Sequence, residues 1–152
     1  MQERKDKWTV GEWMTRNPQA VTPETSVKSA FFQMRAEGFR HLPVVEDGKL
    51  VGMVTDRDLR RPDLTDEPDG WHDFYQLDED YEVRHVMTTR VESMVPSDGL
   101  EKALQLLIDR KFGAAPVVDK TGTMIGIVTT YDLMRAFQAA LGEVGEALRA
   151  GI

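Results

Sequence analysis

Two short elements, Thr55-x-x-Asp58 and Thr129-x-x-Asp132, carry the side chains whose types and spacing could do chemistry. Each follows a run of β-branched residues and precedes a helical pattern, so its aspartate is expected in the first turn of a helix. A carboxylate there can accept two hydrogen bonds from adjacent hydroxyl groups of a sugar. It can also simply complement the helix dipole, a role worth about 0.3–1 kcal/mol. Ligand binding and helix stabilisation both remain open at this point.

These two elements lie in the two copies of an internal repeat. Met14-Thr15 and Met87-Thr88 open two stretches that match at a constant offset of 73 positions, and one inserted residue moves the offset to 74 further along. Each copy is too short to bury a full core, so the two are expected to pack against each other with pseudo-two-fold symmetry. The predicted fold class is therefore α/β (α+β), with two pseudo-symmetric repeats that each combine a small β-sheet with two packed helices.

Residue spacing predicts the same order of elements in each copy. Apolar residues at i, i+3, i+4 and i+7 indicate one amphipathic helix per copy, at 27–34 and 100–107. A β-hairpin follows, with its turn at Asp47-Gly48 in the first copy and at 119–122 in the second. The order in each copy is thus helix, strand, strand, helix, and the Thr-x-x-Asp element connects the second strand to the second helix.

The chain is expected to divide into three parts. Residues 1–61 form repeat 1 with an N-terminal extension, 62–82 form an acidic connector with aromatic residues, and 83–152 form repeat 2 with a C-terminal helix. Trp8 and Trp13 are expected to cover the edge of repeat 1. The C-terminal helix carries an apolar stripe, which either completes the core of the second copy or makes a dimer contact. This stripe consists of Leu133, Phe137, Leu141, Val144 and Leu148.

Composition and charge argue against several classes of protein. The 152 residues contain no cysteine, so no disulfide framework, thiolate metal site or cysteine nucleophile is available. A formal charge of −7 disfavours binding to nucleic acid, and no apolar run approaches the roughly 20 residues that span a bilayer. We expect a cytoplasmic protein that is neither a membrane protein nor an enzyme and holds no metal, because no nucleophile–base pair or metal constellation is apparent.

Three motifs in combination carry a family resemblance. They are the Met-Thr opening, the run Gly38-Phe39-Arg40-His41-Leu42-Pro43-Val44-Val45, and the element Gly52-x-Val54-Thr55-x-x-Asp58-Leu59. The repeats resemble CBS domains, the cystathionine-β-synthase type, and the pair resembles a Bateman module, over roughly 10–60 and 83–140. The stretch 55–61 and the aromatic connector are also similar to the CBS pair of acetoin-utilisation-type proteins.

This resemblance implies a regulatory module that senses an adenosine-containing ligand rather than catalysing a reaction. The implied ligands are AMP, ADP, ATP or S-adenosylmethionine, bound in a cleft between the two copies, and no further cofactor is required. In the family, the aspartate of Thr-x-x-Asp contacts both ribose hydroxyls, and the threonine of the Met-Thr opening comes from the other copy. One implied site combines Thr15, Ala20, Val21, Arg40 and His41 with Thr129 and Asp132. The other implied site combines Thr88, Met94, Gly113 and Ala114 with Thr55, Arg57 and Asp58.

The two implied sites differ in charge. Arg40 and His41 occupy positions where phosphate-binding family members carry basic side chains, whereas Gly113 and Ala114 stand there in the second copy. We therefore expect the first site to favour phosphorylated adenosine. In the second site only Arg57 offers a positive charge, so that site is expected to take a neutral or cationic adenosyl group or to stay empty. Arg40 and His41 could equally be ordinary surface charges.

The resemblance also implies a homodimer, because pairs in this family commonly associate through their helices. An alternative from a different functional class is a structural or interaction protein whose clefts bind nothing and whose helices dimerise or dock on a partner protein. Titration with AMP, ATP and S-adenosylmethionine distinguishes the two, since a scaffold binds none of them at millimolar concentration.

Overall fold

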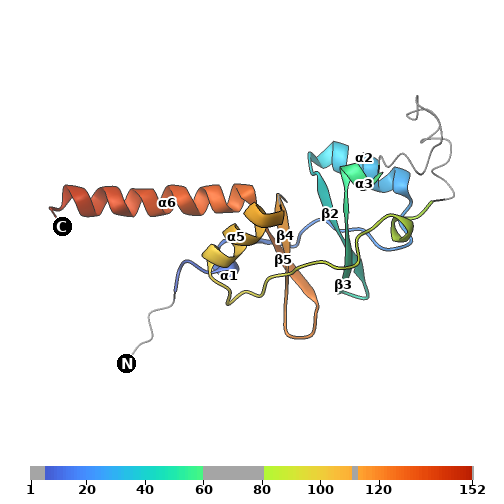
Figure 1. Ribbon diagram of the computed structural model, residues 1–152, viewed down its shortest axis with the longest axis horizontal. Coiled ribbons are helices and arrows are strands. Elements are labelled where there is room, and N and C mark those ends of the chain that lie inside the picture. Colours follow the sequence, from blue (N-terminus) through green and yellow to red (C-terminus); the bar gives the residue numbers. More distant parts are fainter. Residues whose placement is uncertain (1–5, 60–80, 111–112, 152) are drawn as a thin grey trace. The chain divides into compact units, whose positions relative to one another are not determined.

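The structure, a computed structural model, describes residues 6–59, 81–110 and 113–151. Nearly all of the predicted connector, 62–82, therefore lies outside the described residues. The described helices and strands follow the predicted order in both copies (Figure 1). Their bounds are α1 Val10–Trp13, β1 Thr15–Arg16, α2 Val27–Glu37, β2 His41–Glu46, β3 Lys49–Thr55, α3 Asp56–Leu59, η3 Val83–His85, α5 Leu100–Arg110, β4 Ala114–Val118, β5 Met124–Thr129 and α6 Thr130–Arg149.

Contacts between residues divide the chain into two compact units, and each unit contains residues of both sequence repeats. The first, called the α6 unit, comprises Met1–Pro18, Ser93–Lys120 and Ile125–Ile152. The second, called the α2 unit, comprises Gln19–Glu92 and Thr121–Met124. The N-terminal segment of the first repeat thus belongs to the unit that holds most of the second repeat.

The α2 unit is built around the antiparallel hairpin of β2 and β3. Its turn places Asp47 and Gly48 at φ angles of 51° and 81°, the left-handed values that a two-residue hairpin turn of this kind requires. Helix α2 begins after Ser26, whose hydroxyl accepts a hydrogen bond from the backbone N of Ser29 at 3.0 Å, and ends at Gly38. The apolar core of this unit consists of Val21, Val27, Ala30, Phe31, Met34, Leu42, Val44, Val54, Leu59, Val83 and Val86.

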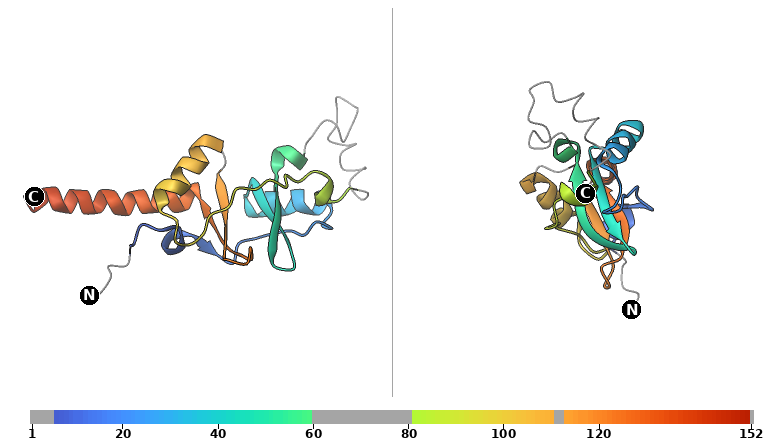
Figure 2. Two further views of the ribbon diagram at one scale, coloured as in Figure 1. Left: turned by 60° about the horizontal axis from the view of Figure 1, so that its bottom comes forward. Right: turned by 90° about the vertical axis from the view of Figure 1, so that its right-hand side faces the viewer.

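The α6 unit contains a three-stranded sheet in the order β1-β5-β4. Helix α5 packs against β4 and against the first part of α6 (Figure 2). The unit has an apolar core of its own, formed by Val10, Met14, Met94, Ala103, Leu107, Ala115, Val117, Val128 and Leu133. Because each unit buries a separate cluster of apolar side chains, packing stabilises both without disulfides.

In each unit a Met-Thr segment from one repeat pairs with the second hairpin strand of the other repeat. Thr15 in β1 lies opposite Ile127 of β5. Thr88 forms an antiparallel bridge with Met53 of β3, and these two residues exchange both backbone hydrogen bonds at 2.9 Å. Since Ile127 and Met53 each stand two positions before the threonine of a Thr-x-x-Asp element, the same pairing occurs in both units.

Helix α6 has 20 residues, and its buried residues lie in the first two turns. They are Asp132, Leu133 and Ala136. The four remaining residues of the predicted apolar stripe are 54–70% exposed: Phe137, Leu141, Val144 and Leu148. The expectation that the stripe completes the core is therefore wrong for these four, because the helix continues beyond the core that it enters. No helix within the described residues is long and apolar enough to cross a membrane.

The N-terminal segment of the α6 unit packs along α6. The rings of Trp8 and Trp13 stack with their centroids 5.8 Å apart, and the guanidinium carbon of Arg135 lies 5.8 Å from the centroid of Trp13. Lys7 forms an ion pair with Glu143. The expectation that the tryptophans cover the edge of the first repeat is wrong, because Trp13 lies against a helix of the second.

Candidate functional site

The carboxylate of Asp132 is the centre of a cluster of hydrogen bonds in the α6 unit. Asp132 is 1% exposed. Its Oδ2 atom accepts hydrogen bonds from the backbone N of Thr129 at 2.9 Å and from the Thr129 hydroxyl at 3.0 Å. The hydroxyl of Thr15 lies 3.1 Å from Oδ1 and 3.3 Å from Oδ2 and donates to the carboxylate. This cluster joins a threonine of the first repeat to the Thr-x-x-Asp element of the second.

Local sequence explains why these three residues meet. Thr129 is the N-cap of α6 and Asp132 is the third residue of that helix, so their side chains and backbone groups bond reciprocally in a capping box. The Thr129 hydroxyl accepts from the backbone N of Asp132 at 3.2 Å. Strand β1 supplies Thr15, because the short ladder between β1 and β5 ends beside the start of α6.

The equivalent cluster in the α2 unit is simpler. The Oδ2 atom of Asp58 accepts from the backbone N of Thr55 at 3.0 Å, and the Thr55 hydroxyl accepts from the backbone N of Asp58 at 3.1 Å. Thr88 occupies the position of Thr15, but among the described residues no hydroxyl donates to the Asp58 carboxylate. Asp58 is only half-buried. Two sequence elements of the same composition thus hold their carboxylates differently.

Arg40 and His41 lie beside the Asp58 element in the α2 unit. His41 pairs with Thr55 across the β2–β3 hairpin, and the carbonyl of Arg40 accepts from the backbone N of Asp56 at 3.0 Å. Burial lowers the pKa of His41 below its ordinary value of 6.5, and the Arg40 charge acts in the same direction, against the opposing pull of the Asp56 and Asp58 carboxylates. The His41 side chain is therefore mostly neutral at pH 7.

Two of the apolar site residues predicted from the resemblance are structural members of the sheets. Val21 forms a parallel bridge with Val44, and Met94 forms the equivalent bridge with Val117. Both side chains are buried, with 5% and 1% exposure. Any contact that these two residues make with a ligand therefore comes mainly from their backbone.

The other predicted residues differ in accessibility. The Gly113 carbonyl accepts hydrogen bonds from the backbone N and the hydroxyl of Thr130, at 2.9 and 3.1 Å, so it is held at the start of α6. Ala114 is buried in β4, whereas Ala20 and Arg57 are exposed. Ala20 and Arg57 can therefore reach a ligand through their side chains.

The structure joins only some members of each predicted site. Thr15 and Thr129 contact Asp132 in the α6 unit, and Thr55 contacts Asp58 in the α2 unit. Each predicted set as a whole is divided between the two units. That both sets bind a ligand together stays a prediction.

Glycines at a fixed position of both hairpins have a structural role that the sequence reasoning missed. A Cβ atom on Gly126 would lie 2.9 Å from the carbonyl oxygen of Thr15, and one on Gly52 would lie 3.0 Å from that of Thr88. Only a residue without a side chain allows the Met-Thr segment to approach the strand this closely. The signal was present, because both glycines recur at the repeat offset.

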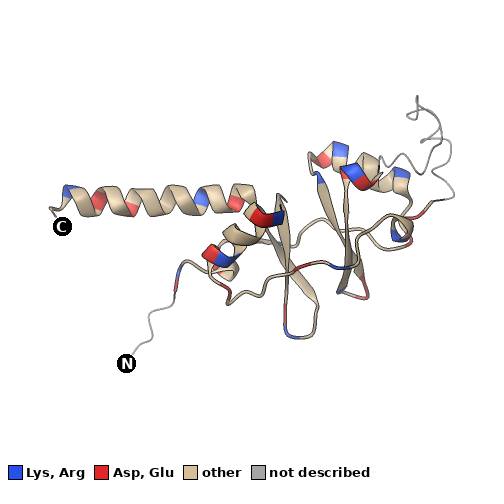
Figure 3. Cartoon of the chain, viewed as in Figure 1, with Lys and Arg blue, Asp and Glu red and all other residues tan. Residues whose placement is uncertain are grey.

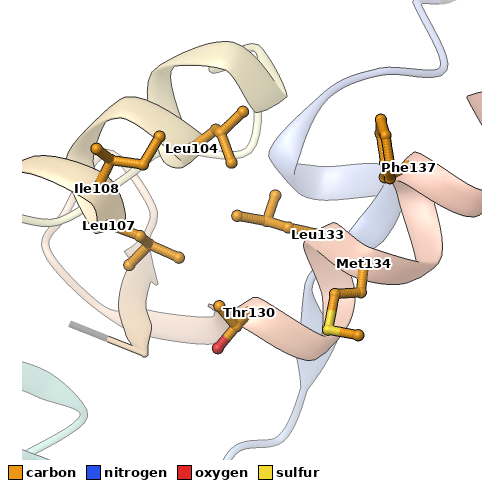
Figure 4. Close-up of a pocket in the computed structure, with 7 residues that line it drawn as sticks. All are labelled: Leu104, Leu107, Ile108, Thr130, Leu133, Met134 and Phe137. Carbon is orange, nitrogen blue, oxygen red and sulfur yellow. The ribbon is translucent and has the colours of Figure 1, made fainter. Parts of the chain in front are cut away.

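An apolar pocket of about 280 Å³ lies between α5 and α6 (Figure 4). Leu104, expected on the core face of α5, is 49% exposed and faces this pocket. Because only hydrocarbon and thioether groups and one threonine surround the space, it suits an apolar side chain rather than a nucleotide. The pocket is lined by Leu104, Leu107, Ile108, Thr130, Leu133, Met134 and Phe137.

The two aspartate clusters are equipped to accept hydrogen bonds. An ionised carboxylate only accepts hydrogen bonds, from donors such as hydroxyl groups, and the adjoining threonines fix its orientation. Within the part of the chain that the structure describes, no group of three or more His, Cys, Asp or Glu side chains could hold a metal ion. A ligand that offers hydrogen-bond donors, such as hydroxyl groups, has the chemistry that these carboxylates can accept.

Comparisons with known proteins identify relatives of this chain in sequence and in fold. The family model described as CBS domain matches residues 10–63 and 83–139. A structure described as an acetoin utilization protein (AcuB) of Vibrio cholerae is 29% identical, with a TM-score of 0.74 over 91% of this chain and 96% of that chain. The structure of Arabidopsis thaliana CBSX2 in complex with AMP is 34% identical, with a TM-score of 0.73 over 88% and 98% of the two chains.

Relatives of known sequence include both short and long proteins. The CBS domain-containing protein YhcV of Bacillus subtilis is 32% identical over 125 residues, which cover 82% of each protein. Two uncharacterized proteins of Methanocaldococcus jannaschii are 28% and 30% identical, and the match spans 43% and 46% of their length. The match therefore covers most of YhcV but less than half of either archaeal protein.

Proposed function

This chain belongs to the CBS-domain family, and on that premise we propose that it is a regulatory module that binds an adenosine-containing ligand. The ribose of the ligand binds at the Thr-x-x-Asp elements. The observation that carries the proposal is the Asp132 carboxylate, which is buried, oriented by Thr129 and contacted by Thr15 from the other repeat. The module senses the ligand and passes the change on to a partner, without catalysing a reaction.

The hydrogen-bonding capacity of the carboxylates supports a ribose as the bound group. Among the described residues, the Thr15 hydroxyl is the one donor to Oδ1 of Asp132, and Thr15 itself is exposed. A cis-diol can approach from that side and place one hydroxyl on each carboxylate oxygen, a bidentate arrangement that a sugar lacking one hydroxyl cannot reproduce. At Asp58 the same approach meets a carboxylate that, within the described part of the chain, accepts a hydrogen bond from the Thr55 backbone N alone.

The choice among adenosyl ligands rests on relatives and on charge. CBSX2, of which this chain covers 98% in structure, has been crystallised with AMP. Arg40 offers a cation and the neutral His41 ring a hydrogen-bonding group, which supports AMP, ADP or ATP at one site. S-adenosylmethionine, with its cationic sulfonium, suits the other site, where Gly113 and Ala114 carry no charge.

Calorimetric titration with AMP, ATP, S-adenosylmethionine and adenosine tests the proposal. We expect binding of at least one of them, and we expect Asp132→Asn and Asp58→Asn each to remove or weaken one binding event. The matched control is Asp98→Asn, an aspartate whose carboxylate also accepts from a backbone N, that of Val95, at 2.9 Å but which lies outside both sites.

The sugar requirement provides an independent arm of the same test. Because the carboxylates are proposed to hold both hydroxyls, 2′-deoxyadenosine and 3′-deoxyadenosine should bind at least about tenfold more weakly than adenosine, the effect of losing one hydrogen bond to a charged group. Absence of binding by every adenosyl compound at millimolar concentration in the intact protein would contradict the proposal.

A second candidate function, an interaction scaffold that dimerises, is favoured by the exposed apolar residues of α5 and α6. The central part of α6, residues 136–142, carries no charge (Figure 3). The α5–α6 pocket and this uncharged helix face form a surface of the kind that helices of a second copy cover. Native mass spectrometry of the purified protein separates the two functions, since it reports a retained nucleotide and the number of chains together.

A further inference from the structure

The two aspartate sites differ in how much of their hydrogen-bonding capacity is already used. A carboxylate offers about four lone-pair positions to donors. At Asp132 these are approached by the Thr129 backbone N, the Thr129 hydroxyl and the Thr15 hydroxyl. At Asp58 the Thr55 backbone N is the one donor among the described residues. The Asp132 carboxylate is therefore close to saturation, whereas Asp58 is not.

A ribose adds two hydroxyl donors. With these two, the number of donors exceeds the hydrogen-bond-accepting capacity of the Asp132 carboxylate but not that of Asp58. At Asp58 the total becomes three donors for about four positions, so the diol binds without displacing anything. At Asp132 the total becomes five, so one present donor must leave. The two groups of Thr129 are fixed by the start of α6, where the hydroxyl also accepts from the backbone N of Asp132.

Thr15 is the donor that leaves most readily. Its hydroxyl is shared between the two carboxylate oxygens at 3.1 and 3.3 Å, which are the longest contacts in the cluster to the carboxylate. Its side chain is exposed, so a displaced hydroxyl can bond to water instead. Thr88 stands at the same register in the α2 unit and makes no such contact within the described part of the chain.

We propose that the Thr15 hydroxyl is an internal competitor of the ribose at Asp132, so that Thr15 sets the difference in affinity between the two sites. This inference rests on the proposed function. Removal of a hydroxyl that contacts the ligand would weaken binding. Removal of the Thr15 hydroxyl should instead strengthen binding, because this hydroxyl competes with the ribose. Thr15 is thus a specificity-determining residue of the Asp132 site.

Thr15→Val tests the inference, since valine keeps the shape of threonine without its hydroxyl. The protein carries Asp58→Asn in addition, so that only the Asp132 site is titrated, and the probe is adenosine, which has no phosphate charge. We expect the variant to bind adenosine about three- to tenfold more tightly, the factor that corresponds to one hydrogen bond. Adenine, which has no ribose, should show no gain. Thr15→Ser, which restores the hydroxyl, should reverse the gain.

Two controls separate competition from a general effect on the fold. Thr22→Val removes a hydroxyl that bonds to Thr25 on a turn of the α2 unit, outside both sites, and should leave adenosine affinity within twofold. Should Thr15→Val fail to fold, the order of the intrinsic affinities gives a second measurement. Adenosine should bind more tightly to Asp132→Asn, which keeps the Asp58 site, than to Asp58→Asn.

The outcomes distinguish the inference from the function on which it rests. If adenosine and AMP bind to neither site of the unaltered protein, the proposed function and the competition by Thr15 are both wrong. If they bind and Asp132→Asn weakens binding, but Thr15→Val binds equally or more weakly, the function stands and the competition is wrong. A reversed order of the two intrinsic affinities likewise overturns the competition alone.

Discussion

Gly126 lies so close to Met14 that a Cβ atom on the glycine would be 2.7 Å from the methionine Sδ. Gly52 and Met87 repeat the same relationship at 2.7 Å in the other unit. The contact matters because the Met-Thr segment of one repeat pairs with the hairpin of the other repeat at this position. Both units depend on the absence of a side chain at this position.

Alanine at either glycine should destabilise the unit that contains it. Because the added methyl group meets both a methionine side chain and a backbone carbonyl, the strand must shift, and we expect Gly126→Ala to lower the free energy of unfolding by about 1–3 kcal/mol. Urea denaturation measures the loss. Gly142→Ala is the matched control, since nothing lies within 4 Å of its new Cβ, and in the middle of a helix alanine should add about 0.5–1 kcal/mol. Equal effects of the two substitutions would contradict this reading.

The threonine that begins α6 should contribute as a helix cap. Thr129→Ala removes the acceptor of the Asp132 backbone N and a donor to the buried carboxylate, and should cost about 1–2 kcal/mol in thermal or urea unfolding. Thr129→Ser keeps the hydroxyl and should cost much less. An equally large loss with serine would mean that the methyl group, rather than the hydroxyl, stabilises the helix start.

Acid should weaken the fold through His41. Its pKa is lowered in the folded protein, chiefly by burial, so below an unfolded-state pKa of 6.5 the unfolded chain binds a proton that the folded chain resists. The free energy of unfolding should therefore fall as the pH drops from 7 through 6.5 towards the lower pKa of folded His41. His41→Gln should flatten this part of the profile. NMR titration of the His41 ring gives the folded pKa directly, and a value above 6.5 would contradict the prediction.

The exposed stripe of α6 should govern self-association. Leu141→Arg places a charge on the apolar face of the helix, where 54% of the leucine is exposed, and should shift any dimer to monomer in sedimentation velocity. The stability of the monomer should change by less than about 0.5 kcal/mol, since the residue is outside the core. Glu146→Arg, on the opposite side of the helix, is the control that should leave the association unchanged. A dimer that survives Leu141→Arg would exclude this stripe as the contact.

Local patterns were sufficient to predict the elements of the fold. The i, i+3, i+4 and i+7 spacing predicted helices at 27–34 and 100–107, and α2 and α5 cover both ranges. The hairpins follow from β-branched runs around a turn, where Asp47 and Gly48 adopt the expected positive φ angles. These features depend on neighbours in sequence, so the residues themselves were enough to specify them.

The residue pattern could not predict which distant segments of the chain pair with each other. The repeat offset shows that the segments Met14-Thr15 and Met87-Thr88 are equivalent. Each of them could therefore pair with the hairpin of its own repeat or with that of the other repeat, and the sequence does not distinguish the two. The contribution of the opening threonine to the other copy came from the family resemblance. The difference between Asp132, bonded by Thr15, and Asp58, not bonded by Thr88 within the described residues, involves identical residue types and so had no signal in the sequence.

The exchange of Met-Thr segments also dictates the order in which the protein can be completed on the ribosome. Thr15 precedes Asp132 by 117 positions, so at about 5–20 residues per second the N-terminal strand waits many seconds for the partner that it pairs with. The unit around α2 likewise needs Thr88 and residues 121–124, which are made late. Neither unit can close during synthesis of the first half of the chain. The core of the α2 unit, residues 21–86, is complete soon after Val86 is made, whereas the core of the α6 unit is complete only when Leu133 has been made.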